Sequence, residues 1–447
     1  MTNDASLLMK SDEYGLLTDL YQLTMAACYV GEGLDQRRAS FELFVRRLPK
    51  GFGYLIAAGL AAALDYLENF RFTAAQLAAL KETDIFPGAP PKFWDLLESS
   101  QFSGDVWAVP EGTAIFANEP ILRVEAPLWQ AQIVETYLLN AINYQTLIAT
   151  RAARLRDVAG SEAILLEFGT RRAFSPQASL WAARAALAGG LDATSNVLAA
   201  LKLGRKPVGT MAHALVMAIS ALEGSEADAF EAFHRYFPGA ALLIDTYDTV
   251  AAARLLGQQT DHSLAGVRID SGDLVTLSQQ VRHELPDVPI FASGDLDEQE
   301  ILRLKQAGAC IDGYGLGTKL VTGVPVNGVY KIVDIDGVPV MKESSGKLTY
   351  PGRKQIFRSA AGDRLGLAAE ATSADSGGLL NPIMRNGVRL VPDDPLETIR
   401  ERASQSVAQL PLSVRDVYQP VVPQAEISTA LRDLTNCTRR SHLATVN

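Results

Sequence analysis

The sequence predicts an α/β fold built around a parallel sheet, and three observations support this. Between 163 and 333, short apolar runs alternate with stretches whose apolar residues recur at spacings of three and four, as in strands followed by amphipathic helices. Nearly every run ends in small or polar residues, and parallel strands bring such ends to one face. The composition is 48% hydrophobic, which is enough for a large core.

Seven runs form the expected strands. They are AILLEF (163–168), ATSN (193–196), PVGT (207–210), ALLIDT (241–246), AGVRID (265–270), PIFAS (289–293) and CIDGYG (310–315). Helical patterns such as 274–285 and 297–308 separate them, and we expect Gly308 to form the C-cap of the second. Successive strand–helix steps fit either a barrel or a doubly wound sheet. A closed ring explains the polar strand ends better, because it brings all seven together.

The flanking segments have a different character. Residues 1–130 mix a helical stretch, LTDLYQLTMAACYV, with Pro/Gly punctuation and strand-like pieces such as DVWAV and TAIFA. Beyond 333, IDGVPVMKES and GKLTYPGRKQIFRSA look like hairpin strands, with an Asp-Gly turn in the first. We therefore expect 1–130 and 334–447 to form one flanking α+β domain, and 131–333 to form the α/β barrel domain. The polar final twenty or so residues are expected to be loosely held.

Composition excludes several classes of protein. Lys and Arg number 41 against 51 Asp and Glu, and the net charge of -10 opposes non-specific attraction to nucleic acid or anionic lipid. Cys28, Cys310 and Cys437 lie far apart, which argues against a disulfide framework or a zinc ribbon. We find neither a signal-peptide pattern nor 18 consecutive apolar residues. We expect a cytoplasmic protein with no nucleic-acid or membrane partner.

Carboxylates follow two successive predicted strands, at Asp245 and Asp248 and again at Asp270 and Asp273. Carboxylates in this position can hold Mg²⁺, bind the vicinal hydroxyls of a ribose, or stabilise a developing cation. The alternative for each one is that it caps the next helix, a role for which Asp is well suited. Four of them at neighbouring strand ends favour a ligand site.

Small residues follow the last two strands in FASGDLDE and GYGLGTKL, namely Ser293, Gly294, Gly313, Gly315, Gly317 and Thr318. Glycines let a phosphate approach the backbone N–H groups, and barrels often hold a phosphate at their last two strand ends. Most glycine-rich turns only satisfy backbone geometry, so the position of this one after the final strands is what favours a phosphate site.

Two more groups stand after strands. In LLEFGTRRAFSP, Phe168 could stack on a heteroaromatic ring while Arg171 or Arg172 holds a carboxylate, although paired arginines also serve as surface ion-pair partners. In GTMAHALVM, His213 begins an apolar helix, and its imidazole suits acid/base work or phosphoryl acceptance. A lone histidine is more often a hydrogen-bonded structural residue.

Taken in order, these motifs resemble those of the nicotinate phosphoribosyltransferases, which are type II phosphoribosyltransferases. The matching segments cover most of the chain: TDLYQLTMA (18–26), FELFVRRLPKGFGYLIAAGL (41–60), EPILRVEAPLWQAQIVETYLLNAINYQTLIATRAAR (119–154), EFGTRRA (167–173), LDATSNVLA (191–199), GTMAHA (209–214), IDTYDT (244–249), RIDSGDL (268–274), ASGDLDE (292–298), YGLGTKL (314–320) and YPGRKQIFR (350–358). The resemblance implies an irregular (β/α) barrel of about seven strands with a flanking domain.

The resemblance also implies a role for each site residue. Arg171 would hold the nicotinate carboxylate. Phe168 would stack on one face of the pyridine ring, and Tyr21 from a neighbouring subunit of a homodimer would cover the other face. The other implied roles are binding of the ribose and the metal-linked pyrophosphate by Asp270 and Asp273, 5′-phosphate binding by Gly294, Gly315, Gly317 and Thr318, and phosphorylation of His213 by ATP. The chemistry of carboxylates at strand ends, rather than the resemblance, suggests Asp245 and Asp248 as metal ligands.

The implied reaction is ATP-coupled, Mg²⁺-dependent transfer of phosphoribose from 5-phosphoribosyl 1-pyrophosphate to nicotinate, giving nicotinate mononucleotide for NAD salvage. One departure is visible: many members read RRAHGP where this chain has Phe174 and Ser175 in RRAFSP. The alternatives are a nicotinamide or quinolinate enzyme, a type I phosphoribosyltransferase suggested by ALLIDTYDT, and a non-catalytic barrel scaffold.

Overall fold

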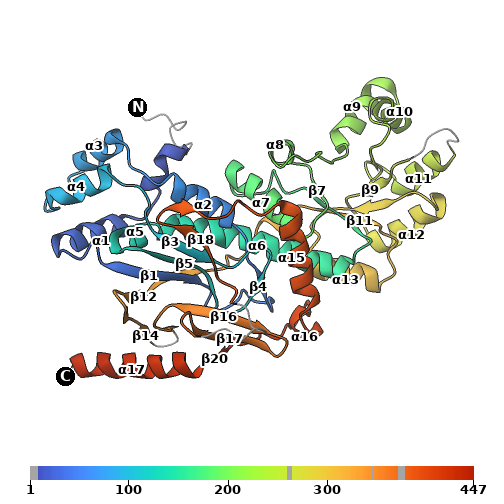
Figure 1. The fold of residues 1–447 in the computed structure, drawn as a ribbon. Helices are drawn as coiled ribbons and strands as arrows, with labels where there is room; N and C mark the ends of the chain where they lie inside the picture. Colours follow the sequence, from blue (N-terminus) through green and yellow to red (C-terminus); the bar gives the residue numbers. More distant parts are fainter. Residues whose placement is uncertain (1–8, 259–263, 345–346, 371–377, 447) are drawn as a thin grey trace. The chain divides into compact units, whose positions relative to one another are not determined.

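The computed structural model describes residues 9–258, 264–344, 347–370 and 378–446 (Figure 1). The chain forms two compact units. Unit 1 comprises Met1–Leu147, Pro325–Pro395 and Pro420–Asn447, and unit 2 comprises Ile148–Val324 and Leu396–Gln419. These limits differ from the sequence-based boundaries at 130/131 and 333/334. Helix α6 (Glu135–Ala159) is continuous across the unit limit between Leu147 and Ile148. Helix α15 (Leu396–Ala408) belongs to unit 2 because it packs on α7 (Pro176–Ala188) of that unit.

Unit 2 contains a six-stranded sheet in the order β7-β6-β11-β10-β9-β8, and all of its neighbouring strands are parallel. Its strands are β6 (Ile164–Glu167), β7 (Ala193–Thr194), β8 (Leu242–Leu243), β9 (Val267–Ile269), β10 (Ile290–Ala292) and β11 (Gly313–Leu316). Five of them lie within predicted runs, and β11 extends one residue beyond the run 310–315.

The run PVGT (207–210) is not a strand, contrary to prediction. Val208 N donates to Thr194 O at 3.0 Å, and this is the one backbone hydrogen bond between the segment and β7 within the described ranges, so the segment lies beside β7 without forming a ladder. One hydrogen bond is too few to define a strand pair.

Helices separate the strands of unit 2 as the apolar spacing predicts (Figure 1). Besides α7 they are α8 (Val197–Lys202), α9 (His213–Glu223), α10 (Glu226–Tyr236), α11 (Thr249–Gly257), α12 (Leu274–Glu284), α13 (Glu298–Gln306), α14 (Thr318–Val321) and, after α15, α16 (Leu412–Arg415). Several begin at a side-chain cap: Ser175, Asn196, Ser225, Asp248, Asp273 and Asp297 each accept a hydrogen bond from a backbone N–H of the first turn.

Unit 1 is built on a seven-stranded antiparallel sheet in the order β13-β12-β1-β5-β3-β18-β19. Strands from the N-terminal segment form its centre, and strands from the C-terminal segment flank them on both sides. The strands are β1 (Arg38–Phe44), β3 (Asp105–Ala108), β5 (Pro120–Pro127), β12 (Val329–Ile335), β13 (Val338–Pro339), β18 (Asn381–Arg385) and β19 (Val388–Arg389). The predicted Asp-Gly turn joins β12 to β13, with Asp336 and Gly337 at positive φ angles of 51° and 80°.

The rest of unit 1 consists of helices and small sheets. Its helices are the 3-10 turn Ser11–Leu16, α1 (Leu20–Gly31), α2 (Leu60–Glu68), α3 (Ala74–Glu82), α4 (Pro91–Glu98), α5 (Leu128–Ile133) and α17 (Thr429–Val446). Its small sheets use β2 (Leu55–Ile56), β4 (Ala114–Ile115), β14 (Lys342–Ser344), β15 (Lys347–Thr349), β16 (Lys354–Ser359), β17 (Gly362–Leu367) and β20 (Glu426–Ile427). The tail expected to be loosely held thus forms helix α17.

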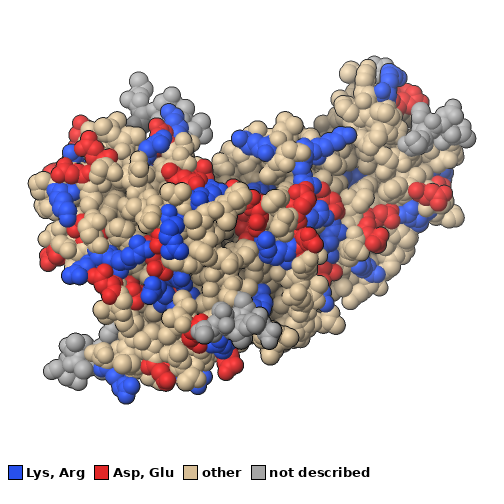
Figure 2. Space-filling view, viewed as in Figure 1, with Lys and Arg blue, Asp and Glu red and all other residues tan. Residues whose placement is uncertain are grey.

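Two surface properties bear on the predicted partners. Acidic and basic side chains are interspersed over the face shown in Figure 2. Within the described ranges, every helix is too short or too polar to cross a bilayer.

Candidate active site

The predicted site residues of unit 2 gather at the carboxyl ends of the parallel strands. Phe168 follows β6, Asp245 follows β8, Asp270 follows β9, Ser293 follows β10, and Gly315 belongs to β11. Parallel pairing brings these ends to one edge of the sheet. The side chains make a continuous series of contacts there.

Phe168 lies at one end of this series. Its ring occupies the space beside Gly315, where a Cβ atom would approach the ring carbons to 2.6 Å. The guanidinium of Arg268, from β9, lies over the same ring with Cζ 5.9 Å from the centroid. Gly315 is therefore needed so that the aromatic ring can lie over β11.

Asp270 and Asp245 form the centre of the series. Asp270 accepts a hydrogen bond from the Ser293 hydroxyl, and its own N–H donates to Asp245 Oδ2 at 2.9 Å. Asp245 Oδ2 also accepts from Ser271 Oγ at 2.7 Å, and its side chain is only 2% exposed. Its other oxygen, Oδ1, is buried without a hydrogen-bond partner among the described residues. A buried anionic oxygen in this state is a natural point for a cation or a donor from a ligand.

His213 stands at the other end. It is the first residue of α9; its Nδ1 lies 3.1 Å from Thr246 Oγ1 and its Nε2 lies 3.8 Å from Asp245 Oδ1. One ring nitrogen is thus held by a hydroxyl, while the other faces the carboxylate. This arrangement orients the imidazole, as second partners of functional histidines do.

The glycines predicted to bind phosphate lie within β11 or shortly after β10 and β11. Gly294 follows β10 at φ +94°, and a Cβ atom there would be 2.3 Å from Asp270 O, so only glycine fits. Gly317 precedes the first residue of α14, Thr318, and Gly315 lies two residues earlier in β11. Three glycines therefore lie next to the predicted site residues, Gly294 beside Asp270 and both Gly315 and Gly317 beside Phe168.

Comparisons with known proteins identify the family of the chain. Residues 16–143 match the nicotinate phosphoribosyltransferase N-terminal domain, and 164–348 match the nicotinate phosphoribosyltransferase family. A nicotinate phosphoribosyltransferase of Mycobacterium tuberculosis is 42% identical and covers 90% of this chain and 89% of its own. That of Bacillus subtilis is 45% identical over 78% of this chain and 74% of its own. The chain belongs to the nicotinate phosphoribosyltransferase family.

A solved structure leads to the same family. The crystal structure of human nicotinic acid phosphoribosyltransferase has a TM-score of 0.82 and 31% identity, and covers 94% of this chain and 99% of its own. The chain is therefore an enzyme of the nicotinate phosphoribosyltransferase class.

Some predicted residues of this phosphoribosyltransferase stand apart from the series of contacts. Asp248 caps α11 by accepting from Val250 N and Ala251 N at 3.1 and 2.9 Å. Asp273 caps α12, and the Thr276 hydroxyl, its strongest partner, lowers the pKa of the Asp273 carboxyl. Tyr21 lies on α1 of unit 1, with 48% of its surface exposed. The described residues contain no group of three or more His, Cys, Asp or Glu arranged to hold a metal ion.

The positive charges of Arg171 and Arg268 interact with each other, and Arg268 lies over the ring of Phe168. Arg171 is exposed in the turn after β6. Burial lowers the pKa of Arg268; Asp270 and Asp245 oppose this, and the positive charge of Arg171 adds to it. Two guanidiniums close enough to repel each other form a natural counterpart to an anionic ligand.

Arg268 of β9 belongs to the motif RIDSGDL, but we predicted no role for it from the sequence. Arg268 donates to Met211 O at 2.9 Å and lies 4.0 Å from Asp270 Oδ1, while its Nε is buried without a partner among the described residues. The available signal was an arginine in the middle of a short buried strand, where a charge is costly unless it is used.

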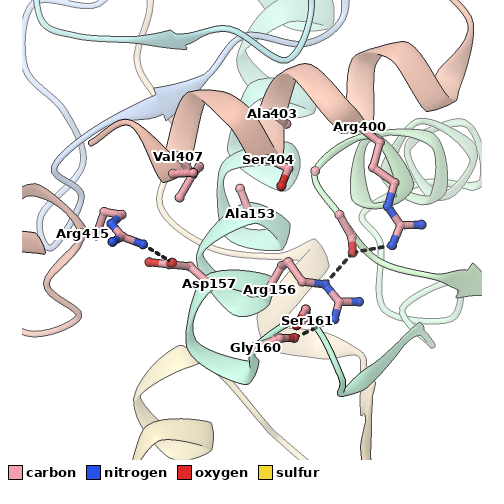
Figure 3. Close-up of a pocket in the computed structure, with 13 residues that line it drawn as sticks. Ala153, Arg156, Asp157, Gly160, Ser161, Arg400, Ala403, Ser404, Val407 and Arg415 are labelled. Carbon is pink, nitrogen blue, oxygen red and sulfur yellow. Dashed lines mark hydrogen bonds and ion pairs between the residues drawn. The ribbon is translucent and has the colours of Figure 1, made fainter. Parts of the chain in front are cut away.

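A cavity of about 370 Å³ lies in unit 2, next to the residues that precede β6 and β7. Arg156, Arg400 and Arg415 line it (Figure 3). Arg156 donates to Gly160 O, Ala163 O and Gly190 O, which are carbonyls following helices α6 and α7, and also to Asp192. Asp192 also binds Arg400, and Asp157 binds Arg415. These arginines therefore join helices to one another and give the cavity a structural explanation.

Proposed function

We propose that the strand ends of unit 2 bind 5-phosphoribosyl 1-pyrophosphate and nicotinate, and join them as nicotinate mononucleotide with release of pyrophosphate, for NAD salvage. The observation that carries this proposal is the unbroken series of contacts from Phe168 through Arg268, Asp270 and Asp245 to His213. It combines an aromatic face, cations and carboxylates within one site of a chain from the matching family.

Nicotinate recognition rests on Phe168 and two arginines. The pyridine ring would stack on Phe168, and its carboxylate would be held by Arg171 with Arg268 as a second cation. Tyr21 would cover the opposite ring face from a neighbouring subunit, and its half-exposed side chain supports this role. Phe174 is 74% exposed and Ser175 caps α7, and the departure at these two positions leaves Phe168 and Arg171 intact in the sequence.

The chemistry needs no general base, because the pyridine nitrogen of nicotinate carries no proton. Positive charge grows on the ribose as pyrophosphate leaves, as it does in glycoside hydrolysis. Asp270 and Asp273 would bind the ribose hydroxyls and the metal-linked pyrophosphate, which is the leaving group. The site would also align the pyridine nitrogen with the anomeric carbon of the ribose. The N–H groups at Gly294, Gly315, Gly317 and Thr318 would bind the 5′-phosphate.

Magnesium fits the carboxylates of this site. Mg²⁺ usually takes one or two carboxylates together with substrate phosphates and water. Asp245, with its unpartnered buried Oδ1, and the neighbouring Asp270 offer such a pair. Asp248, the other predicted ligand, keeps one carboxylate oxygen outside its capping bonds. When bound, the ion would neutralise charge on the leaving pyrophosphate.

We further propose that ATP phosphorylates His213. The phosphoryl group would add a charge of about -1.5 to -2 beside Asp245, enough to rearrange neighbouring groups and bias substrate binding. His213→Ala should still form some nicotinate mononucleotide, but without ATP hydrolysis in step with it. ATP turnover that stays coupled to product in His213→Ala would reject this role.

The assembly and fold have their own support. Exposed apolar side chains of Leu20 and Tyr21 on α1, and of Val197, Leu198 and Leu201 on α8, favour a homodimer interface. The segment 207–210, bonded to β7 through Val208, lies where a seventh strand would extend the sheet toward a closed barrel. Three free cysteines support a reducing, cytoplasmic location.

A substrate panel tests the function. The enzyme is incubated with 5-phosphoribosyl 1-pyrophosphate and Mg²⁺, with or without ATP, and with nicotinate, nicotinamide or quinolinate. We expect nicotinate mononucleotide from nicotinate, more of it with ATP, and little product from the amide. Preferred use of nicotinamide, or release of CO₂ from quinolinate, would assign the chain to one of the alternative activities.

A further inference from the structure

Glu167, the last residue of β6, is a buried carboxylate to which the proposed reaction gives no role. It is 1% exposed and lies in the sheet between Leu316 of β11 and Thr194 of β7. Within the described ranges, neither Lys nor Arg forms an ion pair with it. Burial raises the pKa of Glu167, and hydrogen bonds from Thr194 and Gly169 partly offset this. A buried carboxyl is costly, so its partners indicate why it is there.

Both carboxylate oxygens of Glu167 accept hydrogen bonds from residues next to the proposed nicotinate subsite. Oε1 accepts a hydrogen bond from the N–H of Gly169, and Oε2 accepts one from the Thr194 hydroxyl. Its backbone carbonyl accepts from Ser195 N at 3.0 Å and from Ser195 Oγ at 3.2 Å. One residue thus ties the turn after β6 to the end of β7.

The turn itself has little room to move. A Cβ atom at Gly169 would lie 2.2 Å from Val321 Cγ1 of α14 and 2.9 Å from Glu167 Oε1. Phe168 N donates to Leu316 O at 2.7 Å, and Arg172 N donates to Gly169 O at 2.8 Å. Residues 168–172 are therefore held between the Glu167 carboxylate and the helix that follows the glycine-rich strand.

We propose that Glu167 is the positioning residue of the nicotinate subsite, holding 168–172 in the conformation that presents Phe168 and Arg171. This inference rests on the proposed function. The chemistry favours a carboxylate over an amide. Thr194 Oγ1 already accepts from Asn196 N at 3.0 Å, so its proton is directed to Glu167, and Gly169 N needs the second acceptor. A glutamine would turn an N–H₂ group toward one of these two partners.

Variants of Thr194 test this with the least disturbance of the fold. Thr194→Val removes the hydroxyl at nearly constant volume, and Thr194→Ser keeps it. We expect Thr194→Val and Glu167→Gln each to raise the KM for nicotinate roughly tenfold or more, because a hydrogen bond to a charged group is lost. The KM for 5-phosphoribosyl 1-pyrophosphate should change by less than about twofold, and Thr194→Ser should resemble the wild type.

Exposed Glu162, which precedes the same strand, provides the matched control, and Glu162→Gln should leave both KM values unchanged. The inference fails if Thr194→Val keeps the wild-type KM for nicotinate, if both KM values rise together, or if Thr194→Ser is as impaired as Thr194→Val. The two Thr194 variants decide the question alone if Glu167→Gln does not fold. A wild type that makes no nicotinate mononucleotide would instead refute the proposed function.

Discussion

Charged side chains in the core of unit 1 are paired more tightly than those of the candidate site in unit 2, although unit 2 also has one tight buried pair, Arg154 with Glu298 at 2.8 Å. In unit 1, each of the buried cations Lys354 and Arg123 has a carboxylate within 3 Å: Glu42 lies 2.8 Å from Lys354 Nζ, and Glu125 lies 2.9 Å from Arg123 Nε. In unit 2, Arg268 is 4.0 Å from Asp270, and His213 is 3.8 Å from Asp245. A charged group in a close ion pair is already satisfied within the protein, whereas a charged group whose partner lies about 4 Å away can still bind a charged ligand.

The largest effect should come from breaking a tight pair in unit 1. Lys354 is 3% exposed, and its Nζ also donates to Tyr350 O and Gly352 O. Lys354→Met should lower the free energy of unfolding by about 3–5 kcal/mol, because it leaves Glu42 buried and unpaired. Denaturant unfolding measures this. Arg353→Met removes a half-exposed partner of Glu125 and should cost about 0–1 kcal/mol; equal losses would contradict the contrast.

The next effect concerns the loose pair in unit 2. Asp270→Asn should reduce kcat/KM by about 10²–10³, since the ribose cation loses a stabilising charge, while the unfolding midpoint changes little. Initial-rate kinetics with both substrates measure this. Asp287→Asn, at an exposed position before β10, is the control. A stability loss as large as that of Lys354→Met would show that the Asp270 charge is structural.

Arg171 should show a smaller and more selective effect. Arg171→Ala removes a charge-assisted hydrogen bond to the nicotinate carboxylate and should raise the KM for nicotinate about 10–100-fold. The KM for 5-phosphoribosyl 1-pyrophosphate should stay near the wild-type value. An unchanged nicotinate KM would move recognition of the carboxylate away from Arg171.

The smallest effect is a pH dependence in unit 1. Burial, followed by the neighbouring Asp363, raises the pKa of Glu119 well above its ordinary value. The folded pKa exceeds the unfolded one, so the stabilising contribution is complete below about pH 4 and is lost as pH rises through the raised pKa. Glu119→Gln should therefore gain stability over the wild type as pH rises, by about 1 kcal/mol, in thermal scans. Exposed Glu98→Gln should follow the wild type at every pH; a parallel Glu119→Gln curve would contradict this.

Strands and helices of unit 2 were largely predictable, because apolar period and strand-end polarity are local signals. The segment 207–210 has the composition of a strand but only one backbone bond to β7, and pairing depends on tertiary geometry. Asp248 and Asp273 cannot be separated from ligand carboxylates by sequence, since a cap and a ligand use the same residue type. The contacts of Arg268 and Glu167 depend on the register between strands, which sequence does not specify.

A crystal structure with bound nicotinate mononucleotide tests the central claim most directly. We expect the pyridine ring to lie against Phe168, its carboxylate to lie within hydrogen-bond distance of Arg171, and the ribose hydroxyls to contact Asp270. A nucleotide bound in the cavity between Arg400 and Arg415, or at strand ends without contact to Phe168 and Arg171, would contradict it.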